Sequence, residues 1–169
     1  MNRTMKVAVA AALLLGLTAG AEAQSTKPKD ARVKRGEYLA TIMDCGGCHT
    51  PGVFFGKPDA SRPFAGSEVG FQIPGLGVFF PPNLTPDKAT GLGSWSEKEI
   101  IAAIRTGTRP DGRVLAPVMP YKHYGALTDA DASALAAYLK SLPPVSNQVP
   151  AMTGPSEKPS GPYLTVAMP

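Results

Sequence analysis

Residues that bind metals or form disulfides are scarce in this sequence. Its 169 residues include two cysteines, Cys45 and Cys48, and two histidines, His49 and His123. A structural disulfide between the two cysteines is one alternative, and a zinc half-site is another. A zinc site would need all four of these residues, across a long gap and without the usual closely spaced pair of histidines. The composition therefore disfavours zinc without excluding it.

The sequence also lacks any cluster of basic residues interleaved with aromatic ones. Its formal net charge is only +4, and it has a single tryptophan. Nucleic-acid-binding domains concentrate lysine and arginine on one face, so we expect no nucleic-acid partner. Beyond residue 23 no apolar run approaches the ~20 residues that cross a bilayer, so we expect no membrane span in the mature chain.

The N-terminus has the three parts of a secretory signal peptide. Arg3 and Lys6 supply the positive start, residues 7–17 are almost wholly apolar, and Ala21-Glu22-Ala23 supplies the small residues of a cleavage site. An uncleaved anchor is the alternative, but the apolar run is shorter than the ~20 residues of a spanning helix. We predict a signal peptide over residues 1–23, with cleavage after about Ala23 and export of the mature chain.

The most informative motif is Cys45-Gly46-Gly47-Cys48-His49. Two cysteines separated by two residues and followed at once by histidine form the attachment pattern of a c-type haem. One turn of backbone brings both thiols to the two vinyl groups, and the histidine becomes an axial ligand of the iron. A thioredoxin-like redox pair is the other alternative, but it should sit in a βαβ unit, which the sequence does not show.

A haem ligated by His49 alone would leave a sixth iron position open, and what fills it decides the function. A methionine thioether suits electron transfer, whereas an open position suits a haem enzyme or a gas- or peroxide-reactive cytochrome. The mature chain offers a nitrogen ligand, His123, and four methionines, Met43, Met119, Met152 and Met168. We favour Met119, because Pro117 and Pro120 restrict the backbone around it.

Three helices are predicted around these motifs. Residues 24–30 indicate a flexible leader, and a helix follows from about Ala31 to Met43, capped by Asp30. Ser96 and Glu99 have capping-box spacing and open a second helix, which ends at Gly107. A third helix runs from about Asp129 to Leu142, and two prolines stop it. Thr128 and Asp131 give its start signal, and its apolar stripe consists of Ala132, Leu135, Ala136, Leu139 and Leu142.

The remaining segments are rich in glycine and proline. Residues 50–95 contain all six phenylalanines. So long a loop is reasonable if its aromatic rings pack on a haem, and a small β-subdomain around residues 78–80 is the alternative. Residues 146–169 form a Pro-rich tail without periodicity, which we expect to be extended or mobile.

Together these features resemble class I c-type cytochromes over residues 31–145. More narrowly, the chain is similar to the single-haem domains of cytochrome subunits that serve periplasmic alcohol- and gluconate-type dehydrogenases. The matching stretches are residues 45–50, 64–66, 83–87, 90–96, 119–121 and 137–145. The resemblance implies a mainly α fold in which three to four helices and long Gly/Pro-rich loops surround one covalently bound haem.

The resemblance also implies roles for individual residues. Cys45 and Cys48 would hold haem c, with His49 as the proximal and Met119 as the distal iron ligand. The family's crossing of its first and last helices would pair Gly36 with Tyr138. Apart from the resemblance, we consider four residues as candidate partners of the haem propionates: Trp95, Arg109, Arg113 and Tyr121.

The function implied is that of a periplasmic one-electron carrier rather than an enzyme. Its donor would be a periplasmic dehydrogenase and its acceptor an oxidase or another cytochrome. The chain departs from those dehydrogenase subunits in one respect, since they carry three such domains and this chain has a single CxxCH. A free-standing carrier is therefore expected, with a bound dehydrogenase subunit as the other possible role.

Overall fold

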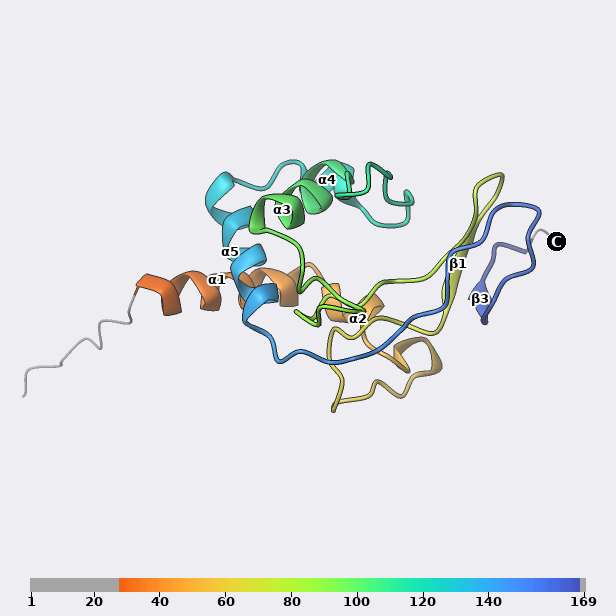
Figure 1. Cartoon of the computed structure of the whole chain (residues 1–169), viewed down its shortest axis with the longest axis horizontal. Coiled ribbons are helices and arrows are strands. Elements are labelled where there is room, and N and C mark those ends of the chain that lie inside the picture. The colour runs from red at the N-terminus through yellow and green to blue at the C-terminus, as the bar shows by residue number, and fades with distance from the viewer. Residues whose placement is uncertain (1–27, 168–169) are drawn as a thin grey trace, which may run out of the picture.

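The computed structural model describes residues 28–167, and within them it has five α-helices, one 3-10 helix and three short strands. The helices are α1 (Pro28–Ile42), α2 (Cys45–His49), η1 (Val53–Phe55), α3 (Glu97–Thr106), α4 (Tyr121–Tyr124) and α5 (Asp129–Ser141). The strands are β1 (Gly70–Ile73), β2 (Gly77–Phe79) and β3 (Tyr163–Leu164) (Figure 1).

The prediction of a mainly helical fold is confirmed. The predicted number of helices, three to four, is lower than the five α-helices of the described residues, because α2 and α4 are too short to show an amphipathic pattern in the sequence. The predicted signal peptide lies outside the described residues.

Helix α1 begins earlier than the sequence predicts. The expected leader extends to residue 30, but residues 28–30 already belong to the helix, and Asp30 lies in its first turn. Pro28 is compatible with this start, since a proline in the first turn loses no intrahelical hydrogen bond. An acidic side chain in the first turn also favours the helix dipole. The helix ends at Ile42, one residue before the predicted end.

Helices α1 and α5 cross at Gly36. A Cβ atom added to Gly36 would lie 2.0 Å from the carbonyl oxygen of Ala134 and 2.6 Å from Cβ of Tyr138. The expected pairing of Gly36 with Tyr138 is therefore confirmed. The ring of Phe64 meets the ring of Tyr138 edge to face, with centroids 5.9 Å apart, and extends the contact toward the loop after α2.

The hydrophobic core lies on two sides of α5, which packs against both α1 and α3. One cluster joins α1 to α5 and contains Leu39, Ala40, Ala134 and Leu135. The other joins α3 and the preceding loop to α5 and contains Leu92, Ile100, Ala136 and Leu139. Leu135, Ala136 and Leu139 belong to the predicted apolar stripe, whereas Ala134 does not and is buried where α5 crosses α1 at Gly36.

The predicted caps of α3 and α5 are confirmed. Ser96 and Glu99 form both halves of a capping box, and Gly107 closes α3 in the left-handed conformation at φ 74°. At α5, the Thr128 side chain accepts a hydrogen bond from the backbone N–H of Asp131. These bonds satisfy backbone groups that a helix end leaves without partners.

The strands form a small sheet in the order β2-β1-β3. The β1–β2 hairpin is antiparallel with Phe71 opposite Phe79, whereas β3 of the tail runs parallel to β1, with Gly70 opposite Tyr163. Phe54 also packs edge to face on Phe71 at 5.2 Å. The β-subdomain alternative is thus confirmed for this part of residues 50–95. Figure 1 shows the sheet at the opposite end of the molecule from the start of α1.

The tail is extended, and buried polar residues hold it in place. Asn83, which is 1% exposed, donates from Nδ2 to the carbonyl oxygen of Val145 at 2.7 Å. Its Oδ1 accepts from the backbone N–H of Thr85 at 2.9 Å. Further along, Thr153 forms an isolated antiparallel bridge with Val78, and the tail then reaches β3. The tail is therefore a strap along the loop and hairpin rather than a free end.

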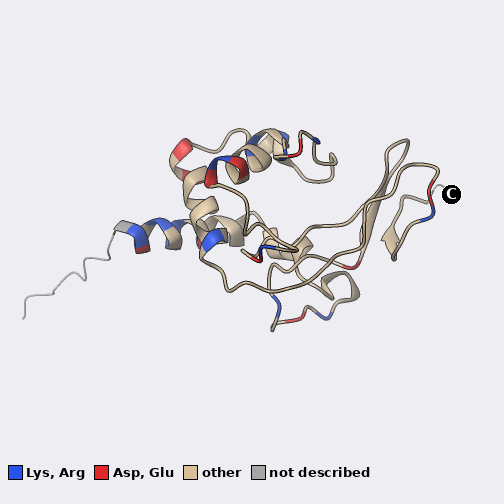
Figure 2. Cartoon of the chain, viewed as in Figure 1, with Lys and Arg blue, Asp and Glu red and all other residues tan. Residues whose placement is uncertain are grey.

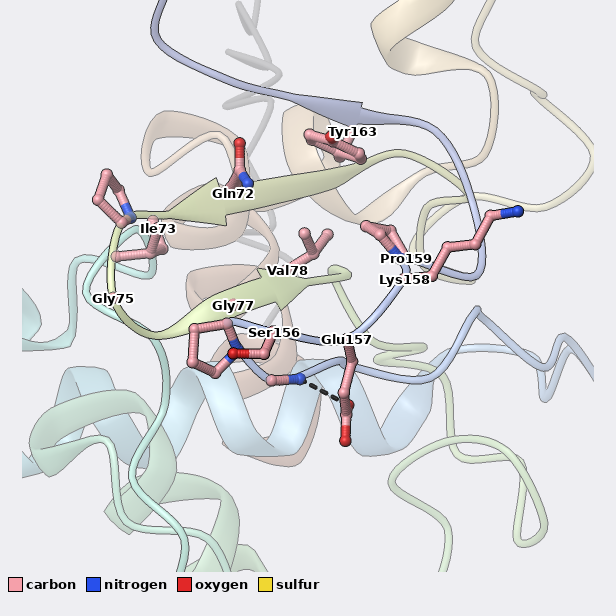
Figure 3. A pocket seen from close by; sticks show the side chains of 13 residues that line it. Gln72, Ile73, Gly75, Gly77, Val78, Ser156, Glu157, Lys158, Pro159 and Tyr163 are labelled. Carbon is pink, nitrogen blue, oxygen red and sulfur yellow. Dashed lines mark hydrogen bonds between the residues drawn. The ribbon is translucent and has the colours of Figure 1, made fainter.

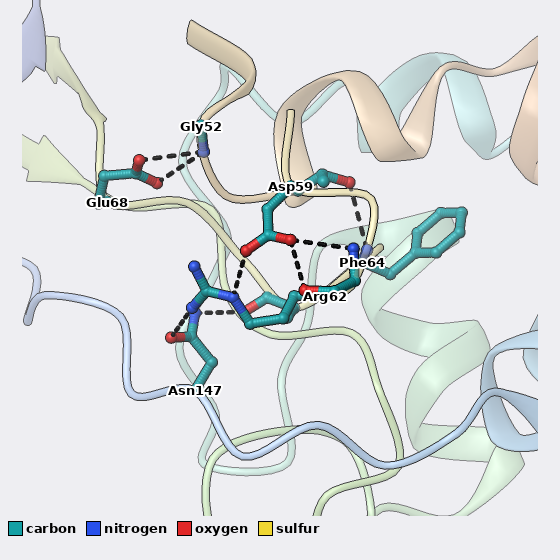
Figure 4. A network of polar contacts seen from close by, with 9 residues as sticks. Gly52, Asp59, Arg62, Phe64, Glu68 and Asn147 are labelled. Carbon is teal, nitrogen blue, oxygen red and sulfur yellow. Dashed lines mark hydrogen bonds and ion pairs between the residues drawn. The ribbon is translucent and has the colours of Figure 1, made fainter. Parts of the chain in front are cut away.

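A second polar network connects the loop after α2 to the same strap (Figure 4). The Asp59 carboxylate accepts from the Ser61 hydroxyl at 2.6 Å and from Nε of Arg62 at 2.7 Å. Arg62 in turn donates to the side chain of Asn147 at 3.3 Å. The Asn147 amide donates to the carbonyl oxygen of Ala65 at 2.8 Å. One connected set of contacts thus joins residues 59–65 to the tail.

Charged residues concentrate on the helices and nearby loops (Figure 2). Between residues 69 and 80 there is no charged residue, and beyond Pro144 only Glu157 and Lys158 are charged. The hairpin and strap are therefore nearly neutral. No helix within residues 28–167 is both long enough and apolar enough to span a bilayer.

Candidate haem site

The two cysteines lie on one short helix directly after α1. Asp44 adopts the left-handed conformation at φ 52° and turns the chain out of α1, so that α2 begins at Cys45. Residues three apart in a helix lie on the same face, which places the thiols of Cys45 and Cys48 side by side along the helix. Both thiols are free rather than joined in a disulfide. This is the local arrangement that attachment to two neighbouring vinyl groups needs.

His49 is buried, at 6% exposure, and its ring orientation is fixed. Nδ1 lies 2.8 Å from the carbonyl oxygen of Pro82. A carbonyl can only accept, so Nδ1 carries the proton and donates it, and Nε2 keeps its lone pair. Burial lowers the pKa of His49, and the bond to Pro82 opposes part of that effect. The imidazole is thus held neutral with one nitrogen available, which is the state that ligates a metal.

The environment of the two thiols differs from that of a redox CxxC pair. Burial, with a smaller contribution from the nearby carboxylate of Asp44, raises the pKa of Cys45 to about 11. The same two causes raise the pKa of Cys48. Catalytic thiols have a lowered pKa, because the thiolate is the nucleophile. These surroundings therefore argue against a thioredoxin-like role.

The zinc alternative also fails on geometry. In the part of the chain that the structure describes, no three His, Cys, Asp or Glu side chains lie close enough together to hold a metal ion. His123 lies on α4, exposed to solvent and outside the CxxCH helix. Cys45, Cys48 and His49 are neighbours on α2 but do not converge on one metal position, which fits a haem bound by two thioethers and one imidazole.

Met119 lies apart from α2, on the segment between α3 and α4. It is half-buried, and its backbone is held on both sides, because its N–H donates to Ala116 at 2.9 Å and its carbonyl accepts from Tyr121 at 2.8 Å. The other described methionines have contacts of their own. Met43 packs against the α1–α5 core, and the Met152 sulfur lies 2.6 Å from Nη1 of Arg113. Met168 lies outside the described residues.

The candidate propionate partners lie around the turn at residues 109–113. The Arg109 guanidinium stands over the Trp95 ring, 5.1 Å from its centroid, and both Arg109 and Arg113 contact Asp111. Tyr121 packs its ring on Gly107, since a Cβ added there would lie 2.9 Å from three ring atoms. The turn is closed by a hydrogen bond from the Gly112 N–H to the Arg109 carbonyl at 3.0 Å.

Two residues at this site have no sequence signal. Pro82, which accepts the His49 proton, lies 33 residues further along the chain, and only the fold brings the two together. Tyr124 donates from its hydroxyl to the Met43 carbonyl at 3.3 Å, across 81 residues. A cavity of about 430 Å³ lies elsewhere, between the hairpin and the strap, and none of the predicted site residues lines it (Figure 3).

Comparison with known proteins agrees with this geometry. The cytochrome c family model matches residues 33–143, the segment that carries most of α1, the CxxCH helix, Met119 and α5. The chain is 39% identical over 127 residues, 75% of its length, to the gluconate 2-dehydrogenase cytochrome c subunit of Pantoea cypripedii. It is 34% identical over 158 residues, 92% of its length, to the cytochrome c subunit of the quinone alcohol dehydrogenase of Gluconobacter oxydans.

A third relative is the fructose dehydrogenase cytochrome subunit of Gluconobacter japonicus, 34% identical over 161 residues. The matched regions are 27%, 31% and 30% of these three relatives, so the chain spans less than a third of their length. Their names describe cytochrome c subunits of dehydrogenases, which agrees with the prediction of an electron-transfer protein rather than an enzyme. With a CxxCH helix, a fixed neutral His49 and a family match across both core clusters, this chain belongs to the cytochrome c family.

Proposed function

We propose that this protein is a one-electron carrier that binds one haem c through Cys45 and Cys48. The observation that carries the proposal is the pairing of two free thiols on α2 with a buried His49 whose Nδ1–H donates to Pro82. In this arrangement the thiols fix the ring of the haem and Nε2 of His49 is the proximal ligand. Haem c, when bound, supplies the one-electron chemistry, its iron alternating between the ferric and ferrous states.

Met119 is the proposed distal ligand. Its segment is short, held by backbone hydrogen bonds on both sides, and half-buried, whereas Met43 and Met152 contact other groups. A thioether ligand favours the reduced state and closes the position to external ligands. The residues of this chain thereby favour electron transfer over the binding of gases or peroxide.

The setting of this activity is proposed from the relatives and from the N-terminus. The relatives named above are subunits of gluconate, alcohol and fructose dehydrogenases, so a dehydrogenase of this kind is the proposed donor. The periplasm is the proposed site of action, because residues 1–23 have the features of a secretory signal peptide. An oxidase or another cytochrome is the proposed acceptor.

Absorption spectroscopy of the oxidised protein tests the ligand set. The wild-type protein should show the near-infrared band of a sulfur–iron bond, and Met119→Ala should lose it. Met152→Ala is the matched control, since it removes a tail methionine and should keep the band. A high-spin ferric spectrum in the wild-type protein, with rapid carbon monoxide binding after reduction, would instead support an open sixth position.

A further inference from the structure

The segment that carries Met119 is tied to the segment that precedes the CxxCH helix. Met119 is followed by α4, and the hydroxyl of Tyr124, the last residue of α4, donates to the carbonyl oxygen of Met43 at 3.3 Å. Met43 lies two residues before Cys45 and packs against the α1–α5 core. Among the side-chain hydrogen bonds of residues 28–167, this one directly connects α4 to the chain leading into α2.

The rest of α4 is fixed on its other side. The Tyr121 ring packs flat on Gly107, the residue that ends α3. Leu127, just after α4, packs against the cluster of Leu39, Ala40, Ala134 and Leu135. The helix itself has only four residues, so its own backbone bonds give it little stability. The position of Met119 relative to α2 therefore depends on these side-chain contacts.

The Tyr124 hydroxyl is suited to this task. Tyr124 is half-buried, and burial raises the pKa of its hydroxyl above its ordinary value. A phenol is protonated at neutral pH even without this shift, so the group is a hydrogen-bond donor. The acceptor is a main-chain carbonyl, so it does not depend on a second side chain.

We propose that Tyr124 is a positioning residue for the sixth ligand, because its bond to Met43 holds the Met119 segment against the segment of the CxxCH helix. This inference rests on the proposed ligation by Met119. When the bond is absent, α4 can move away from Met43 more easily, and the Met119 sulfur leaves the iron more often. An external ligand then enters the sixth position more readily.

The test compares oxidised wild-type protein with Tyr124→Phe, which keeps the ring and removes only the hydroxyl. The readout is the rate at which imidazole displaces the sulfur, followed by loss of the near-infrared band. Loss of one hydrogen bond should make displacement about fivefold faster in Tyr124→Phe, with the band still present before imidazole is added. Tyr163→Phe is the control, since Tyr163 lies on the exposed strand β3, and it should behave as wild type.

Equal imidazole rates in Tyr124→Phe and wild type would overturn the proposal while leaving Met119 as the ligand. Lower stability toward urea with an unchanged imidazole rate would do the same, because it would assign the bond to general stability. If the wild-type protein itself has no sulfur–iron band, the Met119 assignment fails and this inference fails with it. The two failures are therefore distinguishable from one set of spectra.

Discussion

Gly36 is a residue that permits the fold by having no side chain. The backbone of α1 lies so close to α5 that a Cβ atom would overlap the carbonyl oxygen of Ala134, at 2.0 Å. That oxygen belongs to helix backbone and cannot move without shifting α5. A glycine in mid-helix costs about 1 kcal/mol relative to alanine, and here the close packing of the two helices offsets it.

Gly36→Ala should therefore destabilise the protein despite alanine's better helix propensity. We expect a net loss of about 1–3 kcal/mol in the free energy of unfolding, since overpacking forces the helices apart. Urea unfolding of the mature protein, followed by circular dichroism, measures it.

Gly154→Ala is the control for this change. A Cβ atom there would lie 3.6 Å from the nearest side-chain atoms of Glu157, which is ordinary contact. Its stability should stay within about 0.5 kcal/mol of wild type. Equal stabilities of the two variants would mean that the helix crossing is looser than the structure indicates.

At the scale of elements, the loop after α2 and the tail strap stabilise each other through polar side chains. The Asp59 carboxylate accepts hydrogen bonds from the Ser61 hydroxyl and from Arg62, and Arg62 also donates to the side chain of Asn147 in the strap (Figure 4). The bonds from Ser61 and Arg62 lower the pKa of Asp59 to about 2. Folding therefore favours the charged carboxylate.

This shift predicts a pH-dependent effect of Asp59→Asn. The folded-state pKa lies below the usual 3.8, so the stabilisation is present above that value and is lost as the pH falls toward 2. Wild type should be more stable than Asp59→Asn at pH 5–7, and the gap should narrow below pH 4. Urea midpoints measured across this range check it, and a gap that is constant with pH would contradict the assigned cause.

The strap itself depends on Asn83. This side chain is buried, and its amide and carbonyl groups bond the Val145 carbonyl, the Thr90 hydroxyl and the Thr85 backbone. Asn83→Ala should lower the free energy of unfolding by about 2–4 kcal/mol, because it leaves buried partners unsatisfied. Limited proteolysis should also cut the tail faster. Gln148→Ala, an exposed change in the same segment, should alter neither measurement.

Features of this molecule that depend on residues close together in the sequence can be predicted from it, and contacts between distant residues cannot. Each cap of α3 and α5 joins two residues that are three apart in the sequence, so Ser96 and Thr128 locate both helix starts correctly. The CxxCH motif is five residues wide and predicts its helix turn and its ligands as a unit. The apolar stripe of α5 is equally local, and it correctly predicts the buried residues of this helix except Ala134.

The contacts that sequence could not predict are long-range. β3 pairs with β1 across about ninety residues, and nothing in the Pro-rich tail marks Tyr163 as a strand residue. The bond from His49 to Pro82 and the bond from Tyr124 to Met43 have the same origin, since any carbonyl oxygen can accept. These contacts form only when distant segments come together in the folded chain, and no residue type in the sequence identifies them in advance.

At the scale of the whole molecule, two regions differ in secondary structure and in charge. The helical region contains the core clusters, most of the charged residues and the CxxCH helix, whereas the hairpin and strap form a nearly neutral sheet at the other end (Figures 1 and 2). The match to the family model ends at residue 143, so the strap lies outside the matched region. The candidate haem site lies wholly within the matched region.

The central claim, that one haem is attached covalently through Cys45 and Cys48, is tested most directly by intact mass spectrometry under denaturing conditions. The protein should be produced with its export signal in a host that matures c-type cytochromes. We predict a mass equal to the polypeptide from Gln24 onward plus one haem, and no added haem in the Cys45→Ala/Cys48→Ala double variant. A wild-type mass equal to the polypeptide alone would contradict the account.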